Sequence, residues 1–152
     1  MAKKWGVICM LKKIEYICVF LSGGIIYSFI EVAWRGYTHW SMTIAGGICF
    51  MLIHFINAIV YDRNIFMRAV VGGSVITAVE FVVGVVVNLI LHLDVWDYSD
   101  MAGNIAGQVC PLFTVLWFFL AIPAFILSDL IRRFFDSIAE REKNEAKQHQ
   151  RA

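Results

Sequence analysis

Charged residues are scarce in this sequence. Only 16% of the 152 residues are Asp, Glu, Lys or Arg, whereas 60% are hydrophobic. A water-soluble domain of this length needs a polar shell, and this chain has too few polar residues to make one. The low charge therefore excludes an ordinary soluble globular domain and favours a protein that is embedded in lipid.

Several motifs of enzymes and of nucleotide- or metal-binding proteins are also missing. The chain has no GxxxxGK[ST] loop for ATP, no HExxH zinc helix and no GxSxG nucleophile turn. Its four cysteines form no CxxC pair and no cysteine–histidine cluster. No basic surface interleaved with aromatic residues indicates a nucleic-acid partner. We therefore predict no cofactor, no metal site, no nucleic-acid partner and no enzymatic activity.

What the sequence does have is four long hydrophobic blocks. Each is long enough for a helix to cross the hydrocarbon of a bilayer, and none shows the alternation of a barrel strand. The sequence therefore predicts an all-α, four-helix transmembrane bundle within residues 14–131. The predicted spans are about 14–34, 42–61, 69–91 and 109–131, with a basic N-terminus at 1–13 and a charged tail at 132–152.

The basic residues are concentrated in alternate polar segments. Twelve of the 13 Lys and Arg residues lie in the N-terminus, the loop between the second and third blocks, and the tail, whereas the other two loops hold only Arg35. The positive-inside rule therefore predicts that both termini are cytoplasmic. Aromatic residues at the opposite boundary are expected to form an interfacial belt; they are Trp34, Tyr37, Trp40, Trp96 and Tyr98.

Two short signatures occur in each half of the chain. A glycine pair precedes a glutamate by seven residues at Gly24 and Glu31 and again at Gly73 and Glu80, and residues 44–49 resemble 105–110. If this pattern reflects a duplication, two parallel two-helix repeats would bring the two glutamates to related positions. Close helix packing at small residues is the alternative explanation for the glycines.

Polar residues inside the predicted spans or directly at their ends are costly in lipid and are therefore candidates for a substrate or ion site. They are Glu31, Arg35, His54, Glu80 and Asn88. Glu31 and Arg35 are four residues apart and can form an ion pair on one helix face. Glu80 lies near the middle of its span, where it is expected either to pair with His54 or to be protonated. Asn88 can also simply join helices by hydrogen bonds.

The outer loops contain a second group of candidates, namely His39, Trp96, Asp97, Tyr98, Ser99 and Asn104. One interpretation is an outer lid or a mouth that attracts cations. The favoured interpretation is structural, with Trp96 and Tyr98 anchoring the interface and Asp97 or Ser99 capping a short helix before the fourth span.

The chain resembles a bacterial family described as putative ABC-transporter type IV. The resemblance rests on the segments Glu31 to Gly36, His39 to Met42, Val95 to Ser99 and Asn104 to Cys110, together with Gly46-Gly47 and Glu80, Gly84 and Asn88. It implies a multi-pass protein of the bacterial inner membrane. It also implies a separate ATPase subunit or another membrane partner, or a homo-oligomer, because the chain is small and has no ATPase domain.

Three functions remain open at this stage. A transporter or permease component of unknown substrate is favoured by the glycines and the intramembrane carboxylates. An accessory or scaffold subunit would use the same polar residues only to join helices. An intramembrane enzyme acting on a lipid-like substrate would need acids and bases such as Glu31, His39, His54 and Asp97 to converge on a nucleophile.

Overall fold

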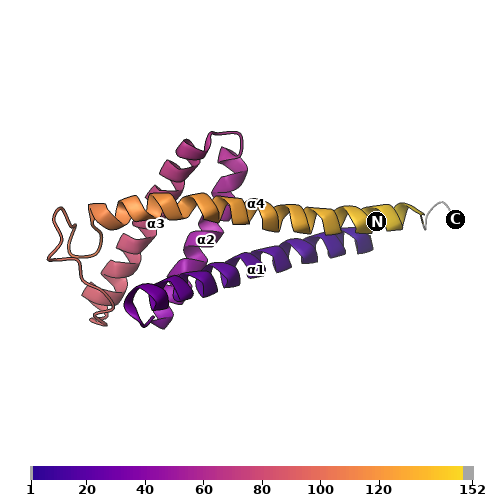
Figure 1. Cartoon of the computed structure of the whole chain (residues 1–152). Coiled ribbons are helices and arrows are strands. Elements are labelled where there is room, and N and C mark those ends of the chain that lie inside the picture. The colour runs from indigo at the N-terminus through magenta and orange to yellow at the C-terminus, as the bar shows by residue number, and fades with distance from the viewer. Residues whose placement is uncertain (1, 149–152) are drawn as a thin grey trace.

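The computed structural model describes residues 2–148, and the side chains of residues 6–144. It contains the predicted all-α bundle (Figure 1). Its elements are α1 (Ala2–Arg35), α2 (Trp40–Val60), α3 (Ile65–Gly84), a π-helical turn η1 (Val85–Ile90) and α4 (Pro111–Gln148). The four helices are long and apolar enough to cross a membrane, so this is a multi-pass membrane protein. The predictions for the side chains of Lys3, Lys4, Lys147 and Arg151 lie outside the described residues.

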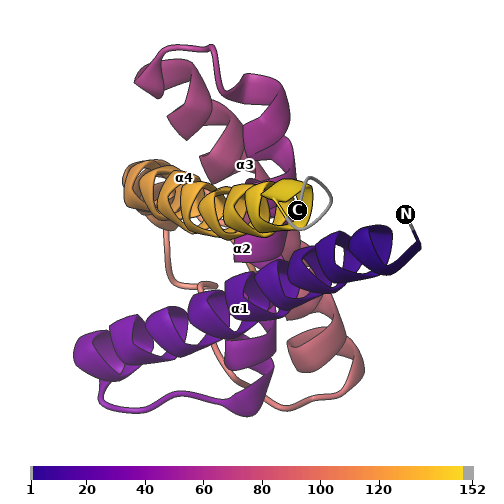
Figure 2. The same ribbon diagram turned by 90° about the vertical axis from the view of Figure 1, so that its right-hand side faces the viewer.

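The two ends of the bundle differ in the segments that they contain. The start of α1 and the end of α4 lie at one end in Figure 1, and the turn between α2 and α3 lies at the top of the view, apart from them. The two connections that were predicted to be extracytoplasmic, 36–39 and 91–110, lie at the opposite end. The α2–α3 hairpin crosses α1 and α4 obliquely in both views (Figures 1 and 2).

The glycine pairs explain how the helices are matched. α1 packs mainly on α2, and α3 packs mainly on α4. A β carbon at Gly23 would lie 2.4 Å from the Phe50 side chain, and one at Gly72 would lie 2.7 Å from Ala121. Small residues therefore let each pair of helices approach closely, as is common in membrane bundles.

This packing bears on the possible duplication. The glycine pairs of α1 and α3 occupy related places, because each faces the helix that forms the second member of its hairpin. The second signature behaves differently: residues 44–49 lie within α2, whereas residues 105–110 form irregular turns before α4. The two halves thus share a packing arrangement but not a complete repeat.

Local signals account for the helix ends. Asn64 caps α3, because its side chain accepts the Met67 amide at 2.8 Å. Gly36 follows α1 with a φ of +80°, a conformation that favours glycine. Pro111 begins α4, where its missing amide donor is not needed. This start lies two residues after the predicted start of the fourth span.

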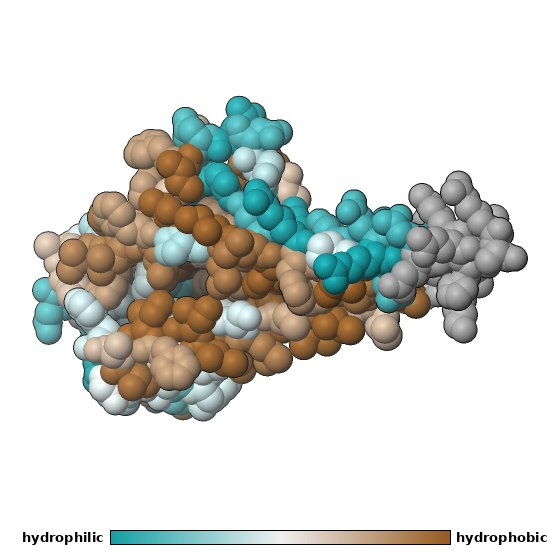
Figure 3. All heavy atoms as spheres, turned by 45° about the vertical axis from the view of Figure 1, so that its right-hand side comes forward, coloured by the Kyte–Doolittle hydropathy of each residue, from teal (hydrophilic) through white to brown (hydrophobic). Residues whose placement is uncertain are grey.

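Much of the molecular surface is apolar. Space-filling atoms coloured by hydropathy show a broad hydrophobic face, with hydrophilic residues along the α2–α3 turn and the C-terminal part of α4 (Figure 3). Side chains such as Ile59, Trp34 and Phe29 are 80%, 74% and 72% exposed. Large exposed apolar residues on every span are expected where lipid is the solvent.

Candidate functional site

The four helices line an apolar cavity of about 330 Å³. Its walls include Gly23 and Tyr27 from α1, Cys49 from α2, Glu80 from α3 and Trp117 from α4. We call this space the central cavity. Its volume lies at the lower end of the range of small-molecule sites, which run from about 300 to 1,000 Å³.

A second, larger hollow of about 650 Å³ adjoins the central cavity. It is lined by α1 and α4, by two residues of the loop 91–110 and by Met42 of α2, and we call it the outer groove. The two spaces share wall residues from α1, the outer loop and α4, including Tyr27, Trp96 and Trp117. Exposed residues such as Trp34 and Phe119 also line the outer groove, so it reaches the lipid-facing surface between α1 and α4.

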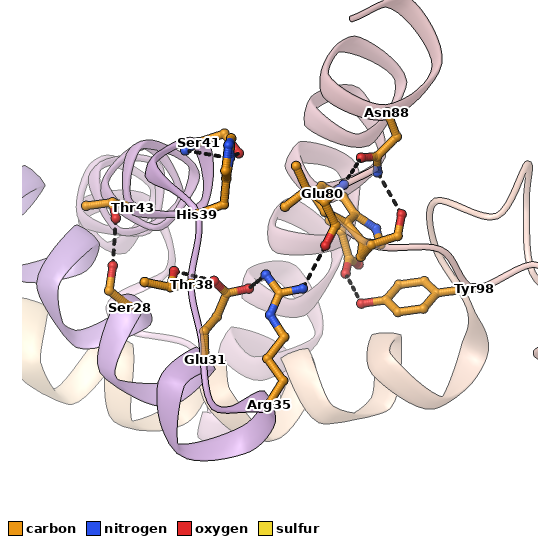
Figure 4. Close-up of polar contacts among 12 residues, drawn as sticks. Ser28, Glu31, Arg35, Thr38, His39, Ser41, Thr43, Glu80, Asn88 and Tyr98 are labelled. Carbon is orange, nitrogen blue, oxygen red and sulfur yellow. Dashed lines mark hydrogen bonds and ion pairs between the residues drawn. The ribbon is translucent and has the colours of Figure 1, made fainter. Parts of the chain in front are cut away.

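Among the residues that the structure describes, Glu80 is the only acidic residue in the wall of the central cavity. Its side chain is buried and receives two hydrogen bonds, from the Trp117 indole N–H at 2.7 Å and from the Tyr98 hydroxyl at 3.1 Å. Each donor binds a different carboxylate oxygen. Figure 4 shows Glu80 of α3 facing the Tyr98 ring, which comes from the outer loop.

The predicted pairing of Glu80 with His54 is wrong. His54 is hydrogen-bonded to Glu15 and Ser128, and Glu80 to Tyr98 and Trp117. Equal depth in two spans does not place two side chains on facing sides of their helices, and that rotation decides which residues meet.

Glu31 and Arg35 form the predicted ion pair near the end of α1. The Arg35 guanidinium donates to Glu31 at 2.8 Å and to the backbone carbonyl of Val95 at 2.8 Å (Figure 4). The Thr38 hydroxyl donates to the second Glu31 oxygen. Both members of the pair line the outer groove. The pair therefore attaches α1 to the outer loop as well as joining two residues of one helix.

Asn88 binds the same loop from the other side. It lies in the π-helical turn, donates to the carbonyl of Trp96 at 2.9 Å and to the Gln108 side chain at 2.8 Å, and accepts the amide of Val95 at 2.8 Å. A β carbon at Gly84 would lie 2.6 Å from Gln108. The loop 91–110 is therefore folded into the bundle against α3 and η1.

This folding gives Trp96 and Tyr98 partners inside the bundle. Both side chains are half-buried and line the outer groove, whereas Trp34, Tyr37 and Trp40 are exposed as a belt requires. Trp96 donates its indole N–H to the Gln108 carbonyl at 3.0 Å. Burial, followed by the nearby Glu80 carboxylate, raises the pKa of the Tyr98 phenol, so Tyr98 remains a hydrogen-bond donor.

The short helix predicted after Asp97 is absent, and residues 97–110 form turns with an isolated bridge between Ile105 and Val109. Asp97 closes a turn because its carboxylate accepts the Ser99 amide at 2.8 Å, two residues ahead, and the Ser99 hydroxyl. These hydrogen bonds hold the pKa of Asp97 below its usual value. Gly107, with a φ of +68°, lies against both side chains.

The remaining two loop candidates act locally. Asn104 donates to the carbonyls of Ser99 and Met101 and accepts the Gly107 amide, which closes the same turn region. His39 precedes α2, and its ring nitrogen accepts the Ser41 amide at 3.4 Å as a helix cap. Figure 4 shows His39 paired with Ser41 and apart from Glu80.

A second polar cluster lies in the half of the bundle nearer the termini, and we call it the inner network. His54 contacts Ser128 at 2.9 Å and Glu15 at 3.1 Å, and Asn57 donates to Ser128 at 3.0 Å. Each of these four side chains is at most 2% exposed. The network joins α1, α2 and α4 by buried hydrogen bonds, which the sequence did not predict as a unit.

The inner network continues toward the α2–α3 turn through an ion pair. Arg68 of α3 donates to Asp129 of α4 at 2.8 Å and to Asn57 at 2.9 Å. Glu15 also accepts from Lys12 at 2.8 Å. The inner network therefore joins all four helices. Its members are Glu15 from α1, His54 and Asn57 from α2, Arg68 from α3, and Ser128 and Asp129 from α4.

Ser128, His54 and Glu15 have the residue types of a hydrolase triad, but their environment does not suit catalysis. Ser128 is fully buried, accepts a hydrogen bond from Asn57 as well, and lines neither the central cavity nor the outer groove. The enzyme hypothesis proposed a different set, Glu31, His39, His54 and Asp97. The structure gives each of those four a different partner.

Several residues of these polar clusters were not predicted from the sequence; they include Glu15, Gln108, Trp117, Ser128 and Asp129. Glu15 follows Lys12 and Lys13, so the local pattern indicates a solvated basic segment. Asp129 precedes Arg132 and Arg133, so it too lies beside a charged segment. A signal was present for Glu15, because it interrupts the apolar block that begins at Ile14. Nothing in the local pattern marks Trp117, since an aromatic residue in a span is usually a packing residue.

Comparison with known proteins gave one match. The profile of the family described as "Putative ABC-transporter type IV" matches residues 41–147, which include α2, α3, η1 and nearly all of α4. The matched range excludes α1, and with it Glu31 and Arg35. No curated protein matches the chain, and no solved structure does. Because the match covers more than half of the sequence, the chain belongs to the putative ABC-transporter type IV family.

Proposed function

We propose that this protein is the substrate-binding membrane component of a transport system. The observation that carries the proposal is the central cavity, a space bounded by all four helices with a single buried carboxylate, Glu80, in its wall. Transporter sites commonly lie near the middle of the bilayer between helices, and an ionisable residue there often marks the substrate or ion pathway.

The route into the cavity supports loading from one side. The outer groove adjoins the central cavity and reaches the lipid-facing surface between α1 and α4. At the opposite end the inner network joins the helices by buried hydrogen bonds. In this proposal the structure represents the state that is open toward the outer groove, and release on the cytoplasmic side requires the inner network to separate.

The energy source in this proposal is a separate ATPase subunit, because the sequence contains no nucleotide-binding loop. We place the protein in the bacterial cytoplasmic membrane with both termini inside, on the basis of the basic residues near the termini and in the α2–α3 turn. A homo-oligomer or a partner membrane subunit would complete the translocation pathway.

Cys49 offers a direct test of the cavity. It lines the central cavity, whereas its neighbour Ile48 on α2 is exposed to lipid. A phenylalanine at Cys49 would fill part of the cavity, whereas one at Ile48 would extend into the lipid. We expect saturable binding of the neutral fluorophore N-phenyl-1-naphthylamine to the wild type and to Ile48→Phe in lipid nanodiscs, with the signal of empty discs subtracted, and weaker binding to Cys49→Phe. Equal binding by the wild type and a folded Cys49→Phe variant, or no saturable binding by the wild type, would contradict the proposal.

An accessory or scaffold subunit is the second candidate. It is favoured by the inner network, in which His54, Asn57 and Ser128 are hydrogen-bonded between helices, as residues that only join helices would be. In that case Glu80→Gln would leave transport by the assembled system unchanged. A reduced flux through a correctly folded and assembled Glu80→Gln complex would support the substrate-binding role instead.

A further inference from the structure

Glu80 differs from the other buried or half-buried carboxylates in the charges around it. Glu31 is paired with Arg35, Glu15 with Lys12, and Asp129 with Arg68. Among the described side chains no Lys, Arg or His forms an ion pair with Glu80. A buried carboxylate without a cation is costly, so this position suits a ligand that brings a positive charge.

The groups that contact Glu80 favour its charged form. The Trp117 indole can only donate a hydrogen bond, and Tyr98 donates to the other oxygen. One donor on each oxygen leaves further lone pairs of the carboxylate available to a ligand. The donors therefore orient the carboxylate without neutralising it.

Aromatic rings surround the same position. Tyr27, Trp96 and Trp117 line the central cavity together with Glu80. The Tyr27 and Trp117 ring centroids are 6.0 Å apart, and Tyr98 continues the aromatic wall by stacking on Phe113 at 4.7 Å. The faces of such rings attract ammonium groups, and clustered aromatic residues are a common way to bind quaternary ammonium ions.

The rest of the cavity is apolar. Its wall includes Ile26, Ile53, Ile76, Leu120 and Leu127, and no Lys or Arg of the described part of the chain lines it. Toward the membrane the cavity meets the outer groove between α1 and α4. A hydrocarbon chain would therefore find apolar walls inside the bundle and a lateral route to the lipid.

We propose that the central cavity binds an alkylammonium amphiphile, with the positive head between Glu80 and the surrounding aromatic rings and the alkyl chain along the apolar wall. This inference rests on the proposed function and adds a substrate class to it. The same head chemistry occurs in simple quaternary ammonium compounds and in choline lipids. In both cases the charge complementarity at Glu80 selects the ligand and the apolar wall holds the chain.

The test uses radiolabelled dodecyltrimethylammonium and the full-length protein in lipid nanodiscs, with binding to empty discs subtracted. We expect saturable binding to the wild-type protein, and a loss of affinity of about tenfold or more in Glu80→Gln, because a hydrogen-bonded charge pair is removed. Asp100→Asn is the matched control: it removes one negative charge from an exposed position in the outer loop, and its binding should equal that of the wild type.

A second pair of variants tests the aromatic wall independently of charge. Tyr27→Leu should weaken binding more than Tyr27→Phe, because phenylalanine retains a ring face. Circular dichroism and size-exclusion chromatography establish that each variant is folded. Equal binding by Glu80→Gln and the wild type, in folded proteins, would overturn the inference.

Further ligands separate this inference from the proposed function. If neutral dodecanol binds saturably and as tightly as the ammonium compound, and neither depends on Glu80, the cavity is a binding site but the cationic class is wrong. If neither compound binds to the wild type, the proposed function fails as well. Displacement of the radiolabelled dodecyltrimethylammonium by dodecylphosphocholine would support the inference and indicate that the ligand is a choline lipid. Displacement only by ammonium compounds without phosphate would also support it and indicate that the ligand is a free amphiphile.

Discussion

The close approach of α3 and α4 at Gly72 can be tested by adding a single methyl group. In Gly72→Ala the new β carbon would lie 2.7 Å from the Ala121 β carbon and 2.8 Å from the Phe125 ring. Optimal carbon–carbon separations are about 3.5–4.0 Å, so the two helices must move apart or Phe125 must shift. Overpacking of this kind costs about 1–3 kcal/mol.

Gly6→Ala provides the matched control. Gly6 is also in a helix, but a β carbon there would meet nothing within 4 Å. Alanine is favoured over glycine in a helix interior by about 1 kcal/mol, so Gly6→Ala should be neutral or stabilising. The same gain applies at Gly72. Subtracting it from the overpacking cost leaves a net loss of about 0–2 kcal/mol at Gly72, and the two variants should differ by about 1–3 kcal/mol.

The free energy of unfolding can be measured by titrating the purified protein in mixed micelles with a denaturing detergent. A compensating change sharpens the test: Gly72→Ala combined with Ala121→Gly moves the methyl group across the interface and should recover part of the loss. Equal stabilities of Gly6→Ala and Gly72→Ala, or no recovery in the double variant, would refute the idea that the glycine pairs are needed for close helix contact.

Two further predictions concern the ends of the bundle. Arg35→Met removes the hydrogen bond to Val95 and leaves Glu31 without its cation. Amide hydrogen exchange in residues 91–110 should therefore become faster, while α2 stays protected. Unchanged exchange in this loop would contradict the role of Arg35. The second prediction concerns the ion pair between Arg68 and Asp129, whose side chains are 12% and 17% exposed. Arg68→Met or Asp129→Leu alone should lower the free energy of unfolding by about 3–5 kcal/mol, because each leaves a charge without its partner, whereas the double variant should lose much less. Additive losses would show that the two residues do not act as a pair.

The number and type of spans could be predicted from composition because a bilayer leaves few options. A block of about 20 apolar residues must satisfy its backbone hydrogen bonds internally, and therefore forms a helix. The ion pair of Glu31 with Arg35 could also be predicted from the sequence, since it depends only on the four-residue spacing along one helix.

The polar partners between helices could not be predicted in this way. Glu15 and His54 are 39 residues apart, and Glu80 and Trp117 are 37 apart. Which residues meet depends on the rotation and tilt of each helix, which are set by packing at the glycines rather than by local sequence. Trp96 and Tyr98 were assigned to the interface because the loop was treated as a solvated connection, whereas Asn88 and Gln108 draw it into the bundle.

The chain order of Glu80 and its two donors has a consequence for assembly. Tyr98 follows Glu80 by 18 residues and Trp117 follows it by 37. At about 5–20 residues per second, the ribosome produces Trp117 about 2–7 s after Glu80. Both donors are therefore synthesised after Glu80, and its carboxyl group can receive both hydrogen bonds only after the loop 91–110 has folded and α4 has been inserted. The wall of the central cavity is thus completed only in the last stage of biogenesis, when the fourth helix joins the other three.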